Sequence, residues 1–120
     1  MALMTTSAAQ AEAFYSEVLD SGEVWTIQDA VGYPAPENSE GRRTMPFWSK
    51  RSRAELVVAR GGAYAAFDVT RIPMDEWRAR WLPGLQRDGM LLGLNWSGSA
   101  ATGYDLEPHE VERNLFARSQ

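Results

Sequence analysis

Positively charged residues gather in one short part of the chain, around the expected start of a helix. Residues 42–60 contain five arginines and one lysine against a single acid, whereas residues 1–41 contain seven acids and no lysine or arginine. Three of the cations follow Ser49 within four residues. The amide groups of a helix N-terminus carry partial positive charge, so acids are favoured there and cations are not. Local helix physics therefore does not explain these cations.

Free N–H groups and added cations at a helix start are typical of an anion-binding site. We therefore predict that this region binds a phosphate, a carboxylate or an acidic protein surface. The candidate residues are the cations, the serine and the tryptophan before it: Arg42, Arg43, Trp48, Ser49, Lys50, Arg51 and Arg53. A second interpretation stays open, in which the cations are a solvated face or pair with the acidic first 41 residues, within one chain or across a symmetric dimer.

The residue sets of the common catalytic and cofactor sites are missing from the sequence. The absence of cysteine removes disulfides, thiolate nucleophiles and cysteine-based zinc sites. The one histidine, His109, has no zinc-ligand spacing around it, and we expect it to be exposed. Ser97 and Ser99 do not fit the G-x-S-x-G pattern, and neither phosphate-binding glycine motif occurs. We expect no catalytic residue, no metal and no cofactor.

Five tryptophans dominate the candidate core. A tryptophan buries roughly 150–250 Å², a gross contribution of about 4–6 kcal/mol at about 25 cal/mol per Å². Trp77 and Trp81 are four residues apart and share one face of a predicted helix. We predict that the tryptophans form the core, with Trp48 beside the basic residues as the exception at the surface.

Apolar spacing and turn residues define the elements that position these side chains. Helices are predicted at 8–19, from Ser49 as N-cap to about 60, from Pro73 to about Leu82, where Pro83 must end or kink the helix, and from Pro108 onward. Strands are predicted at 23–28, 33–35, 44–48, 64–72, 90–96 and 102–106.

This order of elements predicts an α+β fold. Strand pairs alternate with single helices, and the regular βαβ repeat of a doubly wound sheet is absent. We therefore expect one layer of mainly antiparallel sheet with about four helices packed on it. A length of 120 residues fits a single domain over residues 1–120.

Composition limits the partners and the compartment. A net charge of −4 argues against broad affinity for nucleic acid. No stretch approaches the roughly 20 apolar residues that a membrane span needs. Together with the absence of cysteine and of a secretory signal, this predicts a soluble cytoplasmic protein.

Several short motifs occur in an order that is typical of one family. They are Glu23-Val24-Trp25, Pro46-Phe47-Trp48-Ser49, Ile72-Pro73-Met74-Asp75-Glu76-Trp77, Trp81-Leu82-Pro83-Gly84-Leu85, Asp88-Gly89 and Gly93-Leu94-Asn95-Trp96. On these residues the chain resembles the bacterial domain-of-unknown-function family 2750, from about Ala8 to Arg113. The resemblance implies a bacterial domain and brings no catalytic residue, cofactor or substrate.

The function that these observations favour is that of a non-enzymatic interaction domain. Its partner would be another macromolecule, in the first place a protein, bound through the basic segment and neighbouring aromatic residues. The alternative is a small-molecule binding domain for an anionic metabolite at the Ser49 helix start. A homodimer is compatible with both.

Overall fold

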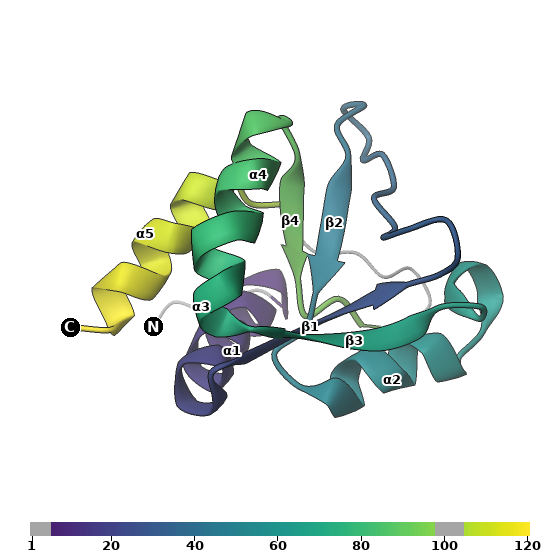
Figure 1. The fold of residues 1–120 in the computed structure, drawn as a ribbon, viewed down its shortest axis with the longest axis horizontal. Coiled ribbons are helices and arrows are strands. Elements are labelled where there is room, and N and C mark those ends of the chain that lie inside the picture. The colour runs from purple at the N-terminus through teal and green to yellow at the C-terminus, as the bar shows by residue number, and fades with distance from the viewer. Residues whose placement is uncertain (1–5, 98–104) are drawn as a thin grey trace.

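The computed structural model describes residues 6–97 and 105–120 (Figure 1). Its helices are α1 (Thr6–Ser21), α2 (Arg51–Ala59), α3 (Met74–Glu76), α4 (Leu82–Arg87) and α5 (Pro108–Arg118), with a π-helical segment, Trp77–Trp81, between α3 and α4 and a 3₁₀ turn at Gly62–Tyr64. Its strands are β1 (Glu23–Gln28), β2 (Thr44–Phe47), β3 (Asp68–Pro73) and β4 (Leu91–Leu94). The predicted α+β class is confirmed, with α3 to α4 counted as one of four helical segments.

The strands form two separate pairs, so the expectation of one mainly antiparallel layer is only partly right. β1 and β3 are antiparallel, with Glu23 opposite Pro73. β2 and β4 are parallel, with Thr44 opposite Leu91. All residues of β2 and β4 are buried, as is usual for parallel strands covered on both faces. Trp48, which follows β2, makes an antiparallel bridge to Trp25 and so links the two pairs.

Two predicted strands differ from the structure, and a third is largely untested. Residues 33–35 do not pair as a strand, because the Asp29 carboxylate accepts the N–H groups of Val31 and Gly32 and turns the chain into a loop. The first half of 64–72 is a 3₁₀ turn and bends, and the strand begins only at Asp68. The strand predicted at 102–106 falls largely outside the described residues.

Pro83 neither ends nor interrupts the helix that contains it. The backbone from Met74 to Arg87 stays helical throughout, and the Leu82 N–H bonds to the Trp77 carbonyl, five residues back. Proline cannot donate a helical hydrogen bond and its ring crowds the carbonyl four residues earlier. A π-turn directly before the proline widens the helix and lets it continue. The helix therefore does not end at Leu82, and the irregularity before Pro83 is the π-helical turn Trp77–Trp81.

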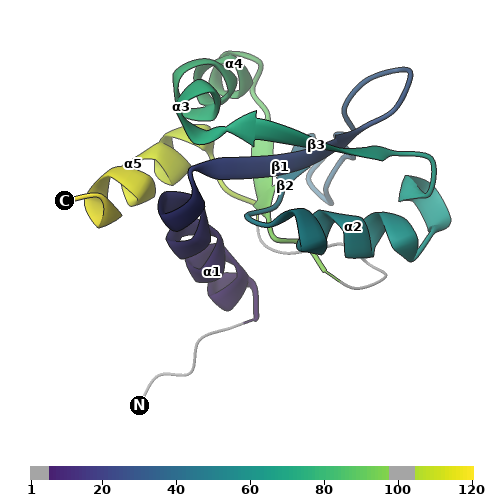
Figure 2. The ribbon, with the colours of Figure 1, turned by 60° about the horizontal axis from the view of Figure 1, so that its bottom comes forward.

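Helices cover both sides of the β1–β3 ribbon. Figure 2 shows α1 and α2 on one side of this ribbon and the α3–α4 helix on the other. The larger core cluster contains buried residues of α1, α4, α5, β2 and β4, with Trp77 fully buried among them. A smaller cluster lies under α2 and is formed by Ile27, Trp48, Ala54, Val57 and Trp96. Tryptophans thus contribute to both clusters, as predicted.

Gly93 in β4 is the place where the core needs a glycine. A Cβ at this position would lie 2.1 Å from Cε2 and 2.2 Å from Nε1 of Trp96. The indole of Trp96 therefore lies against the bare backbone of Gly93, and Trp96 is only 5% exposed.

We predict that Gly93→Ala destabilises the protein by about 1–3 kcal/mol, because the added methyl group forces the indole off its packed position. Urea unfolding followed by tryptophan fluorescence measures the effect. The matched control, measured in dilute solution, is Gly84→Ala, whose Cβ would meet only Arg87 Nη2, at 3.5 Å, and which should be neutral or stabilising. Wild-type stability in Gly93→Ala would contradict the assigned contact.

Candidate functional site

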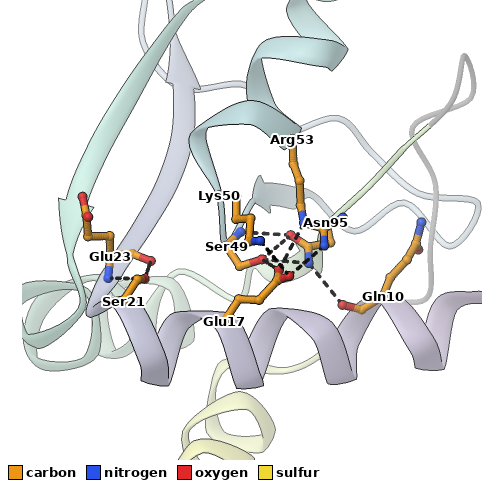
Figure 3. A network of polar contacts seen from close by, with 8 residues as sticks. All are labelled: Gln10, Glu17, Ser21, Glu23, Ser49, Lys50, Arg53 and Asn95. Atoms are coloured by element: carbon orange, nitrogen blue, oxygen red, sulfur yellow. Dashed lines mark hydrogen bonds and ion pairs between the residues drawn. The ribbon is translucent and has the colours of Figure 1, made fainter.

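The structure separates the predicted binding residues into two groups. Ser49, Lys50 and Arg53 come together around the carboxylate of Glu17 on α1 (Figure 3). Arg42, Arg43 and Arg51 each bind a different carboxylate, and Trp48 lies in the core. The seven residues do not form one continuous binding face.

Glu17 is held by three donor side chains. The Ser49 hydroxyl donates to Oε1 at 2.5 Å, and Arg53 approaches both carboxylate oxygens, with Nε at 3.1 Å and Nη2 at 2.9 Å. Lys50 Nζ lies 3.5 Å from Oε2. This two-pronged arginine contact fixes orientation as well as charge. The acidic amino-terminal part of the chain therefore supplies the anion for the start of α2, which is the internal pairing left open by the sequence.

Asn95 completes the arrangement from the other side. Its Oδ1 accepts the Ser49 N–H at 2.9 Å, and its Nδ2 donates to the Ser49 hydroxyl at 3.0 Å and to the Gln10 carbonyl at 3.3 Å. Asn95 adopts φ 55°, a left-handed conformation that asparagine tolerates better than most residues. We call Glu17, Ser49, Lys50, Arg53 and Asn95 the Glu17 cluster.

Two expectations about this junction are wrong. Trp48 is fully buried rather than exposed, and its indole N–H donates to the Trp96 carbonyl at 2.8 Å. Ser49 is not the N-cap of α2: the helix begins at Arg51, its N-cap is Lys50, and no side chain caps it. The Ser49 hydroxyl is used by Glu17 and Asn95 instead, which explains why it does not cap the helix.

The remaining candidate cations pair with carboxylates in other parts of the fold. Arg42 pairs with Glu107 at 2.8 Å and donates to the Gly89 carbonyl at 2.9 Å. Arg43 lies 3.7 Å from Glu37, across the mouth of the 37–43 loop. Arg51 pairs with Glu55, one helical turn later. Exposed pairs such as the last two contribute little to stability.

The electrostatics of the Glu17 cluster favour the ionised carboxylate. Partial burial opposes ionisation, but the hydrogen bonds from Arg53 and Ser49 and the charges of Arg53 and Lys50 outweigh it and lower the pKa of Glu17. The hydrogen bond from Arg42 likewise lowers the pKa of Glu107. An ionised, fully bonded carboxylate is a poor general acid or base, so the cluster has the character of a structural contact.

An open groove lies beside the cluster. It has a volume of about 620 Å³ and is lined by Ser16, Glu17, Leu19, Asp20, Ser21, Ser49, Lys50 and Arg118. Its charges are mixed, so it is not a simple anion pocket. Within residues 6–97 and 105–120, no group of three or more histidines, aspartates or glutamates is placed to hold a metal ion.

Sequence reasoning missed Glu17 and Asn95. Glu17 lies between the predicted core positions of the first helix, and its only signal was the general acid excess of residues 1–41. Asn95 directly follows the most apolar strand, where a polar residue able to adopt a left-handed backbone marks the end of the strand. No local pattern indicated that the two side chains would meet at Ser49.

The chain is thus an α+β domain in which most cations of the basic segment, residues 42–60, form ion pairs with carboxylates of the same chain. The chain belongs to the family described as protein of unknown function (DUF2750), whose model matches residues 11–115. This match confirms the family resemblance. No curated protein matches the chain.

Among solved structures, the chain is similar to one described as Anabaena Tic22 (protein transport). The two are 15% identical with a TM-score of 0.40, and the similarity covers 74% of this chain and 45% of that one. Nothing about function follows from a similarity this low. None of the described helices is both long and apolar enough to cross a membrane.

We predict that Glu17→Gln destabilises the protein by about 1–3 kcal/mol, because Arg53 and the buried Ser49 lose a charged acceptor. Chemical unfolding at neutral pH measures the change. The control is Glu55→Gln, which breaks the exposed Arg51–Glu55 pair and should change stability by less than about 0.5 kcal/mol. Equal effects of the two substitutions would contradict the central role of Glu17.

The difference in the free energy of unfolding between the wild type and Glu17→Gln should depend on pH. Because the pKa of Glu17 is lowered in the folded state, the unfolded state takes up a proton first as the pH falls. The stabilisation is complete above the ordinary glutamate pKa of about 4.3 and is lost as the pH falls through the folded value. The free energies of unfolding of the two proteins, measured from neutral to strongly acid pH, should therefore converge as the pH falls. A difference that stays constant at all pH values would be inconsistent with an ionised Glu17.

Proposed function

We propose that the chain is a non-enzymatic interaction domain that binds an acidic protein surface through the solvent-facing side of α2. The start of α2 cannot serve alone, because Glu17 already neutralises Lys50 and Arg53. The proposed partner contact therefore lies on the outer face of α2 and not at its first turn.

An exposed leucine between arginines carries this proposal. Leu56 is 59% exposed although it lies in the middle of α2. Arg53 and Arg60 lie three residues before it and four residues after it, and therefore on the same side of the helix. Arg60 is exposed and has no ion pair among the described residues. An apolar side chain beside a cation that has no ion pair suits a partner that offers both an apolar contact and an acid.

A small hollow beside Leu56 supports the same surface. It has a volume of about 70 Å³ and lies between α2 and the end of β4, lined by Arg53, Leu56, Val57, Arg60, Asn95, Trp96 and Ser97. A hollow of this size suits one side chain of a protein partner and is too small for a typical metabolite.

We predict that Leu56→Glu/Arg60→Glu abolishes capture of the partner from an extract of the native cell, as measured by mass spectrometry of the bound proteins. The two new acids replace the apolar contact and repel an acidic surface. The matched control is Phe116→Glu on α5, a residue of similar exposure, 61%, far from α2 in sequence. Circular dichroism checks that both variants fold, and equal loss of capture in both would contradict the assignment to α2.

The alternative, an anionic metabolite bound at the start of α2, is favoured by the groove of about 620 Å³ that Ser49 and Lys50 border. This volume lies within the range of small-molecule sites. Such a ligand would have to share the cations with Glu17 or displace it.

A thermal-shift titration separates this alternative from the main proposal. Phosphate or nucleotides should raise the Tm of the wild type, and the Lys50→Ala variant should respond less, because Lys50 is the most exposed cation of the cluster. A flat titration of the wild type removes the alternative and leaves the proposal for α2 intact.

The proposal places the domain in the bacterial cytoplasm. The absence of cysteine is compatible with a reducing compartment, though it does not require one. The proposal assigns no cofactor and no nucleic-acid or membrane partner.

A further inference from the structure

Gly84 lies in the interior of the continuous 74–87 helix, and neither its backbone conformation nor its neighbours within the protein require a glycine there. Its φ is not in the left-handed region. A Cβ there would meet only the flexible end of Arg87, at 3.5 Å. Glycine is unfavourable within a helix relative to alanine, and where it is kept it often allows another backbone or a ligand to approach closely. Gly84 therefore indicates an approach from outside the molecule.

The surface around Gly84 is an apolar groove with one charge of each sign. The groove has a volume of about 280 Å³ and is lined by Met45, Arg80, Trp81, Gly84, Leu85, Asp88 and Met90. Tyr33 packs edge-on against Trp81, with 4.9 Å between the ring centres, and is 39% exposed. Val31, two residues earlier in the chain, is 96% exposed. Methionine and aromatic side chains of this kind are typical of protein contact surfaces.

The charges around Gly84 complement each other under a twofold rotation. Arg80 precedes Gly84 by four residues and Asp88 follows it by four. If two copies of the helix cross in antiparallel orientation at Gly84, Arg80 of each protomer faces the partner subunit's Asp88. Neither residue has an ion pair among the described residues, although both are exposed. The same rotation brings Arg87 towards the partner subunit's Trp81, where a cation–π contact is favourable.

We propose that this groove is the contact surface of a symmetric homodimer, in which two copies of the 74–87 helix cross at Gly84. The occupant of the groove is thus a second copy of this chain. A stable interface of standard size buries about 800 Å² on each subunit, and Tyr33, which packs on Trp81, extends the apolar surface beyond the groove. The surface is distinct from the α2 face, so the dimer leaves the proposed partner contact free.

Sedimentation equilibrium of the full chain tests the dimer. The apparent mass should rise from 13.4 kDa towards twice that value with increasing concentration. Arg80→Asp and Asp88→Arg should each weaken the dimer by about tenfold or more, since each places like charges opposite one another twice. The double variant Arg80→Asp/Asp88→Arg should restore it. The control, Arg113→Asp on α5, should dimerise as the wild type does.

A wild type that stays monomeric at all concentrations overturns the proposal, as do single variants that dimerise normally. Failure of the folded double variant to restore dimerisation also overturns it, because Arg80 and the partner subunit's Asp88 then do not face each other across the interface. None of these outcomes bears on capture through α2.

Gly84→Ala gives an independent readout. At dilution, where the monomer predominates, the variant should have a Tm higher by on the order of 4 °C, because alanine favours the helix. The same variant should dimerise less well, because the added methyl group separates the crossing helices. A lowered Tm would mean that Gly84 serves the fold of the monomer and would contradict the proposal.

Discussion

The carboxylate of Glu17 connects three parts of the chain that are far apart in sequence. Through Ser49 and Arg53 it fixes α1 to the start of α2, and through Ser49 and Asn95 it reaches the end of β4. Trp48 and Trp96, which are next to Ser49 and Asn95 in the sequence, also join the start of α2 to the end of β4. The indole N–H of Trp48 donates to the backbone carbonyl of Trp96. The position of α2 on the β1–β3 ribbon depends on this pairing of a charged contact with an aromatic one. An arginine and a serine that share one ionised acceptor have little freedom, so the start of α2 is held more firmly than the absence of a capping side chain suggests.

Local sequence predicted most of the elements but not their pairing. The run from Glu23 to Gln28 was recognised as a strand because it is rich in branched and aromatic residues. Its partner, Asp68–Pro73, lies about forty residues away, and nothing within either segment specifies the other. The parallel pairing of β2 with β4 is equally non-local. At Pro83 the rule that proline breaks a helix failed, because a widened turn before the ring removes the conflict on which the rule rests.

The candidate site illustrates the same limit for charges. An excess of cations after Ser49 is visible in the sequence, and so is an excess of acids in the first 41 residues, but which acid meets which cation is decided by tertiary packing. Glu17 and Asn95 could not have been singled out, since their roles arise only when α1 and β4 approach Ser49. Trp48 was expected at the surface because its neighbours in sequence are charged. It is buried because the strand before it is enclosed on both faces.

The contact of Arg42 with Glu107 affects how the carboxyl-terminal helix opens and closes. Glu107 precedes α5: its backbone N–H donates to the Glu110 carboxylate, and its backbone carbonyl accepts the Glu110 N–H. The Glu107 carboxylate binds Arg42, which also holds the turn at Gly89. The first turn of α5 and the 37–43 loop thus share one anchoring group. Loosening of the loop should propagate to the helix end, so amide protons of the two segments should exchange with solvent as one cooperative unit rather than fray separately.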